Sequence, residues 1–194
     1  MVKLIGSKKI KTAVFISGTG SNLINLIKFS YSKKSPIKIQ LVISNNKNAK
    51  GIYYAKKFKI RNKTFYYEKG KDPEKLILKE LKLNKIDLIC LAGFMKILSS
   101  NFIKRFKGKI LNIHPSLLPK YKGLNTHSRA IKNEENYSGC TVHYVNSKLD
   151  SGKIILQRKV KIGKKDNHIT LKAKILKQEH ILYPKAIIKL FSNP

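Results

Sequence analysis

Short apolar runs alternate with segments of helical periodicity along nearly the whole chain, and this alternation restricts the possible fold more than any other feature. The apolar runs predict strands at residues 12–18, 37–45, 63–67, 86–94 and 109–114, and two more within 139–162. Helices are expected at residues 21–32, 48–60, 72–85, 99–108, 128–135 and 169–191. This order is typical of an α/β fold with a wound, mostly parallel sheet flanked by helices. With 194 residues, the chain has room for one such domain.

Local signals mark where several elements begin and end. Ser21 or Asn22 is placed to cap the first helix, and Asp-Pro-Glu at residues 72–74 is a strong helix start. A turn at residues 150–152 is expected to join the last two strands. Pro184 lies inside the last helical pattern, so it is expected to kink or interrupt that helix.

A glycine-rich stretch, SGTGSN at residues 17–22, joins the first predicted strand to the first predicted helix. Glycines allow the backbone to approach a ligand, and the N–H groups at a helix start attract an anion such as phosphate. The stretch lacks the Lys-Ser/Thr of a P-loop, and Leu23 occupies the third glycine position of a dinucleotide-binding fingerprint. From the pattern alone, a phosphate cradle and a plain tight turn are equally good interpretations.

Polar side chains occupy the end of the predicted strand at residues 109–114. Asn112 and His114 alternate with apolar neighbours, so both are expected on one face at the carboxyl end of the strand. Ligands of open α/β sheets bind at that end, and a carboxamide beside an imidazole suits a developing oxyanion and a mobile proton. A polar strand end that faces water is the competing interpretation.

Asp150 would extend this pair into a catalytic group if it met His114 in space. Within its own stretch, LDSGKIILQ, an ordinary Asx-turn accounts for the residue, and that interpretation is the simpler one. The alternative is a carboxylate that orients His114 and moves a proton. The sequence leaves both hypotheses open.

The remaining histidines and one acidic residue carry weaker signals. His127 is expected to contact an anion or cap a helix, His143 to be an ordinary sheet residue, and His168 to lie on the surface at a helix start. Glu179 is one of only 10 acidic residues and is a candidate ligand for an amine or another cation. The histidines, cysteines and carboxylates show no zinc-like spacing, so no metal is predicted.

The net charge of +32 suggests a nucleic-acid-binding protein. However, only four of the 42 basic residues are arginine, the side chain on which proteins that read bases rely. The lysines are also spread along the whole chain. Compositional drift towards A/T-rich codons and selected polyanion binding both stay open, with drift favoured. In either case a basic surface would steer small anionic substrates to the protein.

The cysteines and the apolar runs bear on where the protein works. Cys90 and Cys140 lie in apolar or strand-like stretches, as expected for buried thiols in a reducing compartment. No apolar run approaches the roughly 20 residues of a membrane span, and the N-terminus lacks a signal-peptide pattern. The chain is therefore expected to be cytoplasmic, with no membrane contact.

Several stretches together are far more specific than any one of them. VFISGTGSNL, LAGFMKILS, LNIHPSLLPKYKGLNTH, LDSGKIILQ and QEHILYP follow in this order and cover nearly the whole chain. Through them the chain resembles the folate-dependent formyltransferases, most closely those that act on glycinamide ribonucleotide. The resemblance implies the formyltransferase fold, Rossmann-like in its N-terminal half, as a single domain over residues 1–194. About 10–110 would bind the ribonucleotide phosphate, and about 111–194 would hold the catalytic and folate-binding residues.

The resemblance also implies a site, residue by residue. The implied catalytic residues are Asn112, His114 and Asp150. Glycinamide ribonucleotide would be bound by Gly18, Gly20, Ser21, Asn22, Gln178 and Glu179. Folate would be bound by Met95, Lys96, Ile97, Leu98, Asn112, Asn146, Leu149 and Asp150. An arginine that relatives carry nearby is missing here, and Lys69 or Lys71 is expected to replace it.

The implied reaction is attack by the glycine amine of the ribonucleotide on the formyl carbon of 10-formyltetrahydrofolate, in purine (IMP) biosynthesis. Asn112 and His114 would stabilise the oxyanion, while Asp150, through a water, would move the proton to the departing folate nitrogen. The expected partners are these two small molecules rather than nucleic acid, and the chain is expected to be a monomer or a weak homodimer. A formyltetrahydrofolate deformylase or a methionyl-tRNA formyltransferase is the enzymatic alternative, and a basic nucleic-acid-binding protein the non-enzymatic one.

Overall fold

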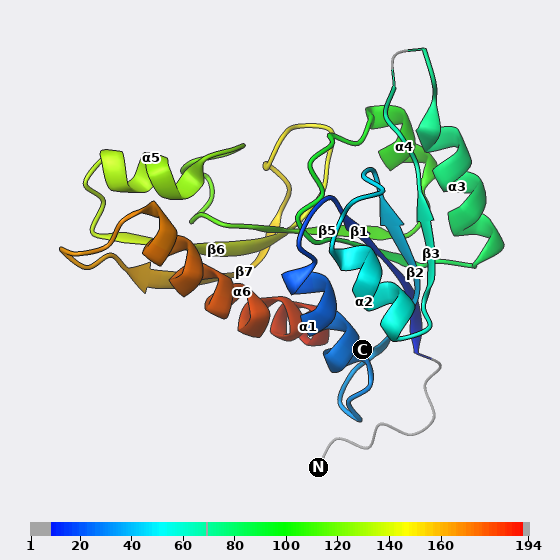
Figure 1. Cartoon of the computed structure of the whole chain (residues 1–194), viewed down its shortest axis with the longest axis horizontal. Coiled ribbons are helices and arrows are strands. Elements are labelled where there is room, and N and C mark those ends of the chain that lie inside the picture. The colour runs from blue at the N-terminus through cyan, green and yellow to red at the C-terminus, as the bar shows by residue number, and fades with distance from the viewer. Residues whose placement is uncertain (1–8, 69, 192–194) are drawn as a thin grey trace.

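A computed structural model describes residues 9–68 and 70–191 and shows one seven-stranded sheet flanked by helices (Figure 1). The strands are β1 (Ile10–Ile16), β2 (Ile37–Ser44), β3 (Arg61–Thr64), β4 (Leu88–Leu91), β5 (Lys109–His114), β6 (Tyr137–Tyr144) and β7 (Ile154–Lys161). Their order is β3-β2-β1-β4-β5-β6-β7. The first five are parallel, whereas β6 and β7 are antiparallel to their neighbours. The predicted mostly parallel α/β sheet is confirmed.

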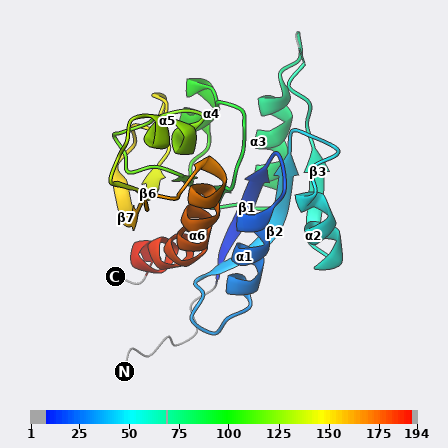
Figure 2. The same ribbon diagram turned by 60° about the vertical axis from the view of Figure 1, so that its left-hand side comes forward.

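The helices cover both faces of this sheet. They are α1 (Ser21–Ser30), α2 (Gly51–Lys57), α3 (Pro73–Leu83), α4 (Ser100–Arg105), α5 (Thr126–Lys132) and α6 (His168–Phe191). Helices α1 and α6 lie side by side on one face, and α3 and α4 lie on the other (Figures 1 and 2). Strand β1 supplies both cores: Val14 and Ile16 pack towards α1 and α6, whereas Ala13 and Phe15 pack towards α3 and α4. A strand buried on both faces reads as a continuous apolar run, as this one does.

Local chemistry explains most helix boundaries. The Asp72 side chain caps α3 as expected, accepting hydrogen bonds from the N–H groups of Glu74 and Lys75. The predicted capping of α1 by Ser21 or Asn22 is wrong, because both residues lie inside the helix. Gly20 occupies the cap position with a φ of 75°, a left-handed conformation that glycine adopts without strain.

Two other sequence expectations differ from the structure. The third strand ends at Thr64 instead of continuing to residue 67. Helix α6 runs through Pro184 without a break, so the expected interruption is wrong. Proline leaves the carbonyl four residues earlier without its helical partner, and that carbonyl, on His180, accepts a hydrogen bond from Asn25 Nδ2 at 2.7 Å. A side chain of α1 thus replaces the bond that the proline removes.

The strand order determines where ligands can bind. In the order 3-2-1-4-5 the chain direction across the sheet reverses between β1 and β4, which opens a crevice at their carboxyl ends. The loop at residues 17–20 follows β1, and residues 92–99 follow β4 at the same edge. Because β5 is the next strand in the sheet, His114 ends at this edge too. A division of the chain into a phosphate-binding half and a catalytic half stays a prediction.

Candidate active site

His114 and Asp150, 36 positions apart in sequence, meet at the carboxyl end of β5. His114 is the last residue of that strand, and Asp150 lies in the connection between β6 and β7. His114 Nδ1 lies 3.3 Å from Asp150 Oδ2, and the two side chains are 6% and 8% exposed. Strand β6 runs antiparallel to β5 and ends at Tyr144, opposite Leu111, and the connection that follows it brings Asp150 against His114. The hypothesis that Asp150 is only an Asx-turn residue is therefore rejected.

Both ring nitrogens of His114 face hydrogen-bond acceptors. Nε2 lies 2.9 Å from the backbone oxygen of Tyr121, and Nδ1 faces the Asp150 carboxylate. An imidazolium would donate to both groups, whereas a neutral ring satisfies only one. The Asp150 carboxylate also accepts a hydrogen bond from the Gly123 N–H at 2.9 Å. The ring and the carboxylate are therefore each positioned by a backbone group in addition to their mutual contact.

Asn112 lies on the same face of β5 as His114, as the alternation predicted. Its Nδ2 group is 3.4 Å from Asp150 Oδ1 and 3.2 Å from His143 Nε2. His143 is opposite Asn112 in the β5–β6 register. Asn112 therefore connects the carboxylate to a second, buried histidine.

His143 lies in β6, as the sequence analysis expected of a sheet residue, but its partner at the site could not be read from the sequence. Its Nδ1 lies 2.7 Å from its neighbour's carbonyl, Tyr144 O, which leaves Nε2 free to accept from Asn112. Burial is the main cause of a lowered pKa for His143. A neutral imidazole that accepts one amide hydrogen fixes the orientation of Asn112. Only the register between β5 and β6 reveals this role.

A second buried carboxylate, Glu179, lies where α6 crosses α1. Glu179 Oε2 accepts a hydrogen bond of 2.7 Å from Asn22 Nδ2. Burial raises the pKa of Glu179 to about 7, against the lowering effects of that bond and of Lys172. The Asn22 Oδ1 atom is buried without a partner among the described residues. Asn22 and Glu179, both predicted to bind substrate, thus lie together, and their oxygens can accept further hydrogen bonds.

The glycine-rich loop packs against α2 as well as lining the crevice. A Cβ atom on Gly20 would lie 2.4 Å from the Cα of Gly51 at the start of α2, so no larger residue fits. Gly18 has open space around its Cα. Gln178 precedes Glu179 on α6, and successive helix residues point about 100° apart, so the two do not share a face. Binding of substrate by Gly18, Ser21 and Gln178 stays a prediction.

The residues predicted to bind folate lie on two loops at the carboxyl edge. On the loop after β4, Met95 and Ile97 are 65% and 71% exposed, whereas Leu98 is buried in the core shared with α3 and α4. Leu98 can therefore offer only its backbone to a ligand. Leu149, on the loop after β6, is 51% exposed. Exposed apolar side chains at a crevice suit a flat heterocyclic ligand.

Lys96, Asn146 and the lysines near residue 70 complete the predicted folate set. Lys96 Nζ lies 5.8 Å from the centre of the Tyr67 ring. Asn146 Oδ1 accepts a hydrogen bond from the Lys148 N–H within its own loop. Lys71 pairs with Glu68 at 2.5 Å, and Lys69 lies outside the described residues. Replacement of the missing arginine by either lysine stays a prediction.

The other histidines surround the site less closely. Burial, together with the charges of Lys172, His114 and His168, lowers the pKa of His127 to about 4. His168 is exposed at the first position of α6, as expected. Among residues 9–68 and 70–191, no group of three or more histidines, cysteines and carboxylates is arranged to hold a metal ion. Within the same residues, no helix is long and apolar enough to cross a membrane.

Comparison with known proteins identifies the family. The model of the family described as formyl transferase matches residues 10–187. The chain belongs to the formyl transferase family. It is 45% identical over 186 residues to the phosphoribosylglycinamide formyltransferase of Haemophilus influenzae, a match that covers 94% of this chain and 87% of that protein.

Other formyl transferase relatives agree in sequence and in structure. The crystal structure of phosphoribosylglycinamide formyltransferase from Brucella melitensis is 41% identical, covers 94% of this chain and 96% of that one, and superposes with a TM-score of 0.89. The human trifunctional purine biosynthetic protein adenosine-3 is 40% identical over 186 residues, but this chain spans only 18% of its length. These likenesses extend over almost the whole of this chain.

Proposed function

We propose that this enzyme transfers the formyl group of 10-formyltetrahydrofolate to the glycine amine of 5-phosphoribosylglycinamide, a step of purine biosynthesis. The observation that carries the proposal is the convergence of Asn112, His114 and Asp150 at one buried point of the carboxyl edge. Formyl transfer to an amine needs a donor to the formyl oxygen and a group that moves a proton from the amine to the leaving nitrogen. These three side chains supply both functions.

Each residue has a distinct role in this chemistry. The Asn112 carboxamide offers an N–H group to the negative charge that develops on the formyl oxygen. The His114 ring offers a second one when the formyl oxygen replaces the Tyr121 carbonyl as the partner of Nε2. The 3.4 Å separation of Asn112 from Asp150 is long for a hydrogen bond, so the amide hydrogen that His143 does not bind is available to the substrate. Asp150, held by His114 and by Gly123, accepts a proton directly or through a water. Its position between two histidines suits proton movement rather than nucleophilic attack.

The acceptor amine fits the Asn22–Glu179 pair. Glu179 is nearly unexposed and has one hydrogen-bond donor, and the neighbouring Asn22 Oδ1 has no partner among the described residues. A glycinamide group brings N–H donors to both oxygens, which would remove the cost of leaving a buried acceptor unpaired. The N–H groups at the start of α1 then lie towards the phosphate of the same substrate.

The formyl donor supplies the one-carbon group, and the loops after β4 and β6 carry the residues proposed to hold it. Met95, Ile97 and Leu149 offer exposed apolar surface, and the backbone near Leu98 offers polar groups. Both loops border the edge at which His114 lies. We place the reaction in the cytoplasm, because the buried thiols of Cys90 and Cys140 suit a reducing compartment. We propose that the enzyme acts as a monomer or a weak homodimer.

A spectrophotometric assay with both substrates tests the proposal. Formation of the folate product should require the ribonucleotide, and formylglycinamide ribonucleotide should accumulate in equal amount. Folate product that forms at the same rate without the ribonucleotide would instead identify a formyltetrahydrofolate deformylase. Salt-sensitive binding of RNA or DNA without any formyl transfer would identify a nucleic-acid-binding protein.

A further inference from the structure

The loop Gly93–Leu98, which we call the donor loop, lies at the carboxyl edge of the sheet, where the strand order predicts a ligand-binding crevice. It follows β4, while the glycine-rich loop follows β1, so the two loops stand on opposite sides of the point where the chain direction reverses. Phe94 and Leu98 pack into the core shared with α3 and α4, whereas Met95 and Ile97 between them are 65% and 71% exposed. The segment between the two anchored residues therefore depends on hydrogen bonds to its backbone.

Ser17 makes the inner set of these contacts. Its backbone N–H donates to the Gly93 carbonyl at 3.1 Å, and its Oγ accepts a hydrogen bond from the Met95 N–H at 2.7 Å. The Ser17 hydroxyl in turn donates to Asn45 Oδ1 at 2.5 Å, so both its donor and one acceptor position are used. Ser17 is the first residue of the glycine-rich loop, so it connects that loop directly to the donor loop.

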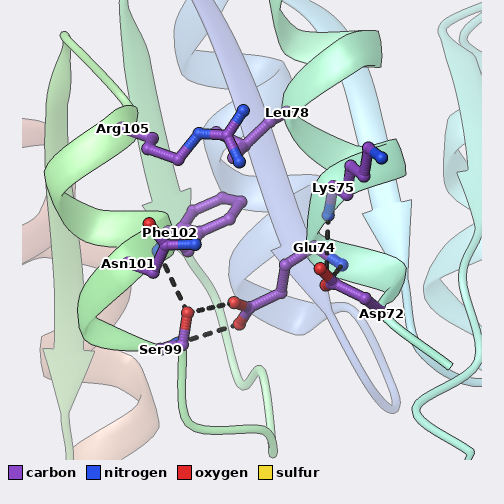
Figure 3. A pocket seen from close by; sticks show the side chains of 8 residues that line it. All are labelled: Asp72, Glu74, Lys75, Leu78, Ser99, Asn101, Phe102 and Arg105. Carbon is purple, nitrogen blue, oxygen red and sulfur yellow. Dashed lines mark hydrogen bonds between the residues drawn. The ribbon is translucent and has the colours of Figure 1, made fainter. Parts of the chain in front are cut away.

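Glu74 makes the outer contact, at the other end of the donor loop. One carboxylate oxygen, Oε1, accepts a hydrogen bond from the Ser99 N–H at 2.9 Å, and the other, Oε2, accepts from the Ser99 hydroxyl. Figure 3 shows both bonds between Glu74 and Ser99. The two residues line a cavity of about 270 Å³ between α3 and α4. Ser99 also caps α4 by accepting from the Phe102 N–H. Glu74 therefore attaches Ser99, the residue that follows the donor loop, to the first turn of α3.

We propose that Ser17 and Glu74 are positioning residues that hold the donor loop from its two ends in the conformation that binds the formyl donor. The proposal rests on the proposed function, because it takes the donor loop as part of the folate site. Neither side chain is required to touch the reacting atoms. Loss of either contact should weaken binding of the formyl donor and leave binding of the ribonucleotide nearly unchanged.

Steady-state kinetics of four variants test this. Ser17→Ala removes the acceptor for the Met95 N–H, and Glu74→Ala removes both acceptors for Ser99. We expect the KM for the formyl donor to rise about tenfold in Ser17→Ala and about fivefold in Glu74→Ala, the scale of one lost hydrogen bond. The KM for the ribonucleotide should change by less than about twofold, and Ser17→Thr, which keeps the hydroxyl, should stay near the wild type. Glu74→Gln keeps one acceptor, so its KM for the formyl donor should lie between the values of the wild type and Glu74→Ala.

Asp72→Asn is the matched control for Glu74→Gln. Asp72 borders the same cavity, and each change removes one negative charge from it, but Asp72 bonds only to the N–H groups of its own helix. We expect Asp72→Asn to lower the melting temperature and leave the donor KM unchanged. Equal donor KM values in Glu74→Ala, Ser17→Ala and the wild type would overturn the proposal, and so would an equal rise in Asp72→Asn.

Amide hydrogen exchange tests the contacts without any catalysis. The Met95 amide should exchange faster in Ser17→Ala, and the Ser99 amide faster in Glu74→Ala, each by about tenfold or more. Unchanged exchange at both amides would reject the two contacts. A wild-type protein that transfers no formyl group would overturn the proposed function, while the exchange result would still decide whether the donor loop is held as described.

Discussion

Two buried carboxylates, Asp150 and Glu179, differ in how many hydrogen-bond and charge partners the protein supplies to each. Asp150 lies beside two histidines and the amide of Asn112, and it accepts a backbone hydrogen bond from Gly123. Glu179 has a single hydrogen-bond donor, Asn22, whose own amide oxygen is left without a partner among the described residues. The first carboxylate is oriented from several sides, whereas the second has room for another partner.

This difference indicates a division of labour within the site. A group that moves a proton must be held at a constant distance from its partners, and the contacts of Asp150 achieve that. A buried acceptor binds a ligand most favourably when the ligand supplies a hydrogen-bond donor that the protein does not. Glu179 and its neighbour Asn22 have such unfilled acceptor positions. Burial raises the pKa of Glu179 to about 7, which shows how poorly its charge is compensated in the free protein.

The largest expected effect is a loss of turnover when Asp150 or its partner His114 is replaced. Asp150→Asn keeps the shape but removes the charge that faces His114, and His114→Ala removes the ring. We expect kcat to fall by a factor of about 100 or more in each variant, the scale of lost acid–base or oxyanion assistance. Rates measured with saturating substrates provide the check. A near-normal kcat in either variant would reject the assigned roles.

The poor compensation of Glu179 should appear in the pH dependence of stability. Because the folded pKa is raised, the folded state favours the protonated carboxyl, so the stability contribution is fully present below about pH 4.5 and is lost as the pH rises through 7. The groups that interact with this carboxylate are Lys172 on its own helix, Tyr183, and Cys140 on β6.

Glu179→Gln, which stays neutral at all pH values, isolates this effect. Relative to the wild type, it should gain up to about 3 kcal/mol in the free energy of unfolding between pH 4.5 and pH 8. Urea unfolding at both pH values measures the gain. A constant difference between the two proteins across this range would reject the raised pKa of Glu179 and its poor compensation.

The same variant should bind its acceptor substrate less well. Glu179→Gln loses the negative charge that we propose attracts the amine end of the ribonucleotide, so the KM for the ribonucleotide should rise by about tenfold to thirtyfold. The KM for the formyl donor should stay within about twofold. An increase in the KM for the formyl donor alone would show that Glu179 contacts the formyl donor and not the ribonucleotide.

The smallest expected effect comes from replacing His143, which tests how Asn112 is oriented beside Asp150. His143→Phe keeps a buried ring but removes the acceptor for the Asn112 amide, so kcat should fall by about fivefold to tenfold with little change in either KM. His143→Gln, which can offer its amide oxygen to Asn112, should recover part of the loss. Equal kcat values in the wild type and His143→Phe would show that Asp150 alone orients Asn112.

Much of the fold and part of the site follow from local sequence. The apolar run at β1 lies between two cores, so its length and composition alone indicate a strand buried on both faces. The alternation around Asn112 and His114 correctly placed both on one face of β5. Side-chain periodicity and capping act over a few residues, and these features depend on nothing more.

Contacts between distant segments had to come from the tertiary structure. Residue spacing left Asp150 as an Asx-turn candidate, and only the folded path of the β6–β7 connection brings it to His114. The register between β5 and β6 gives His143 its partner, and the packing of α1 on α6 brings Asn22 to Glu179 and lets α6 continue through Pro184. Sequence by itself determined which chemical groups this protein holds and on which elements, because those depend on local backbone geometry. The tertiary structure alone decided which of them meet, because hydrogen bonds form between atoms that are close in space, however far apart they are along the chain.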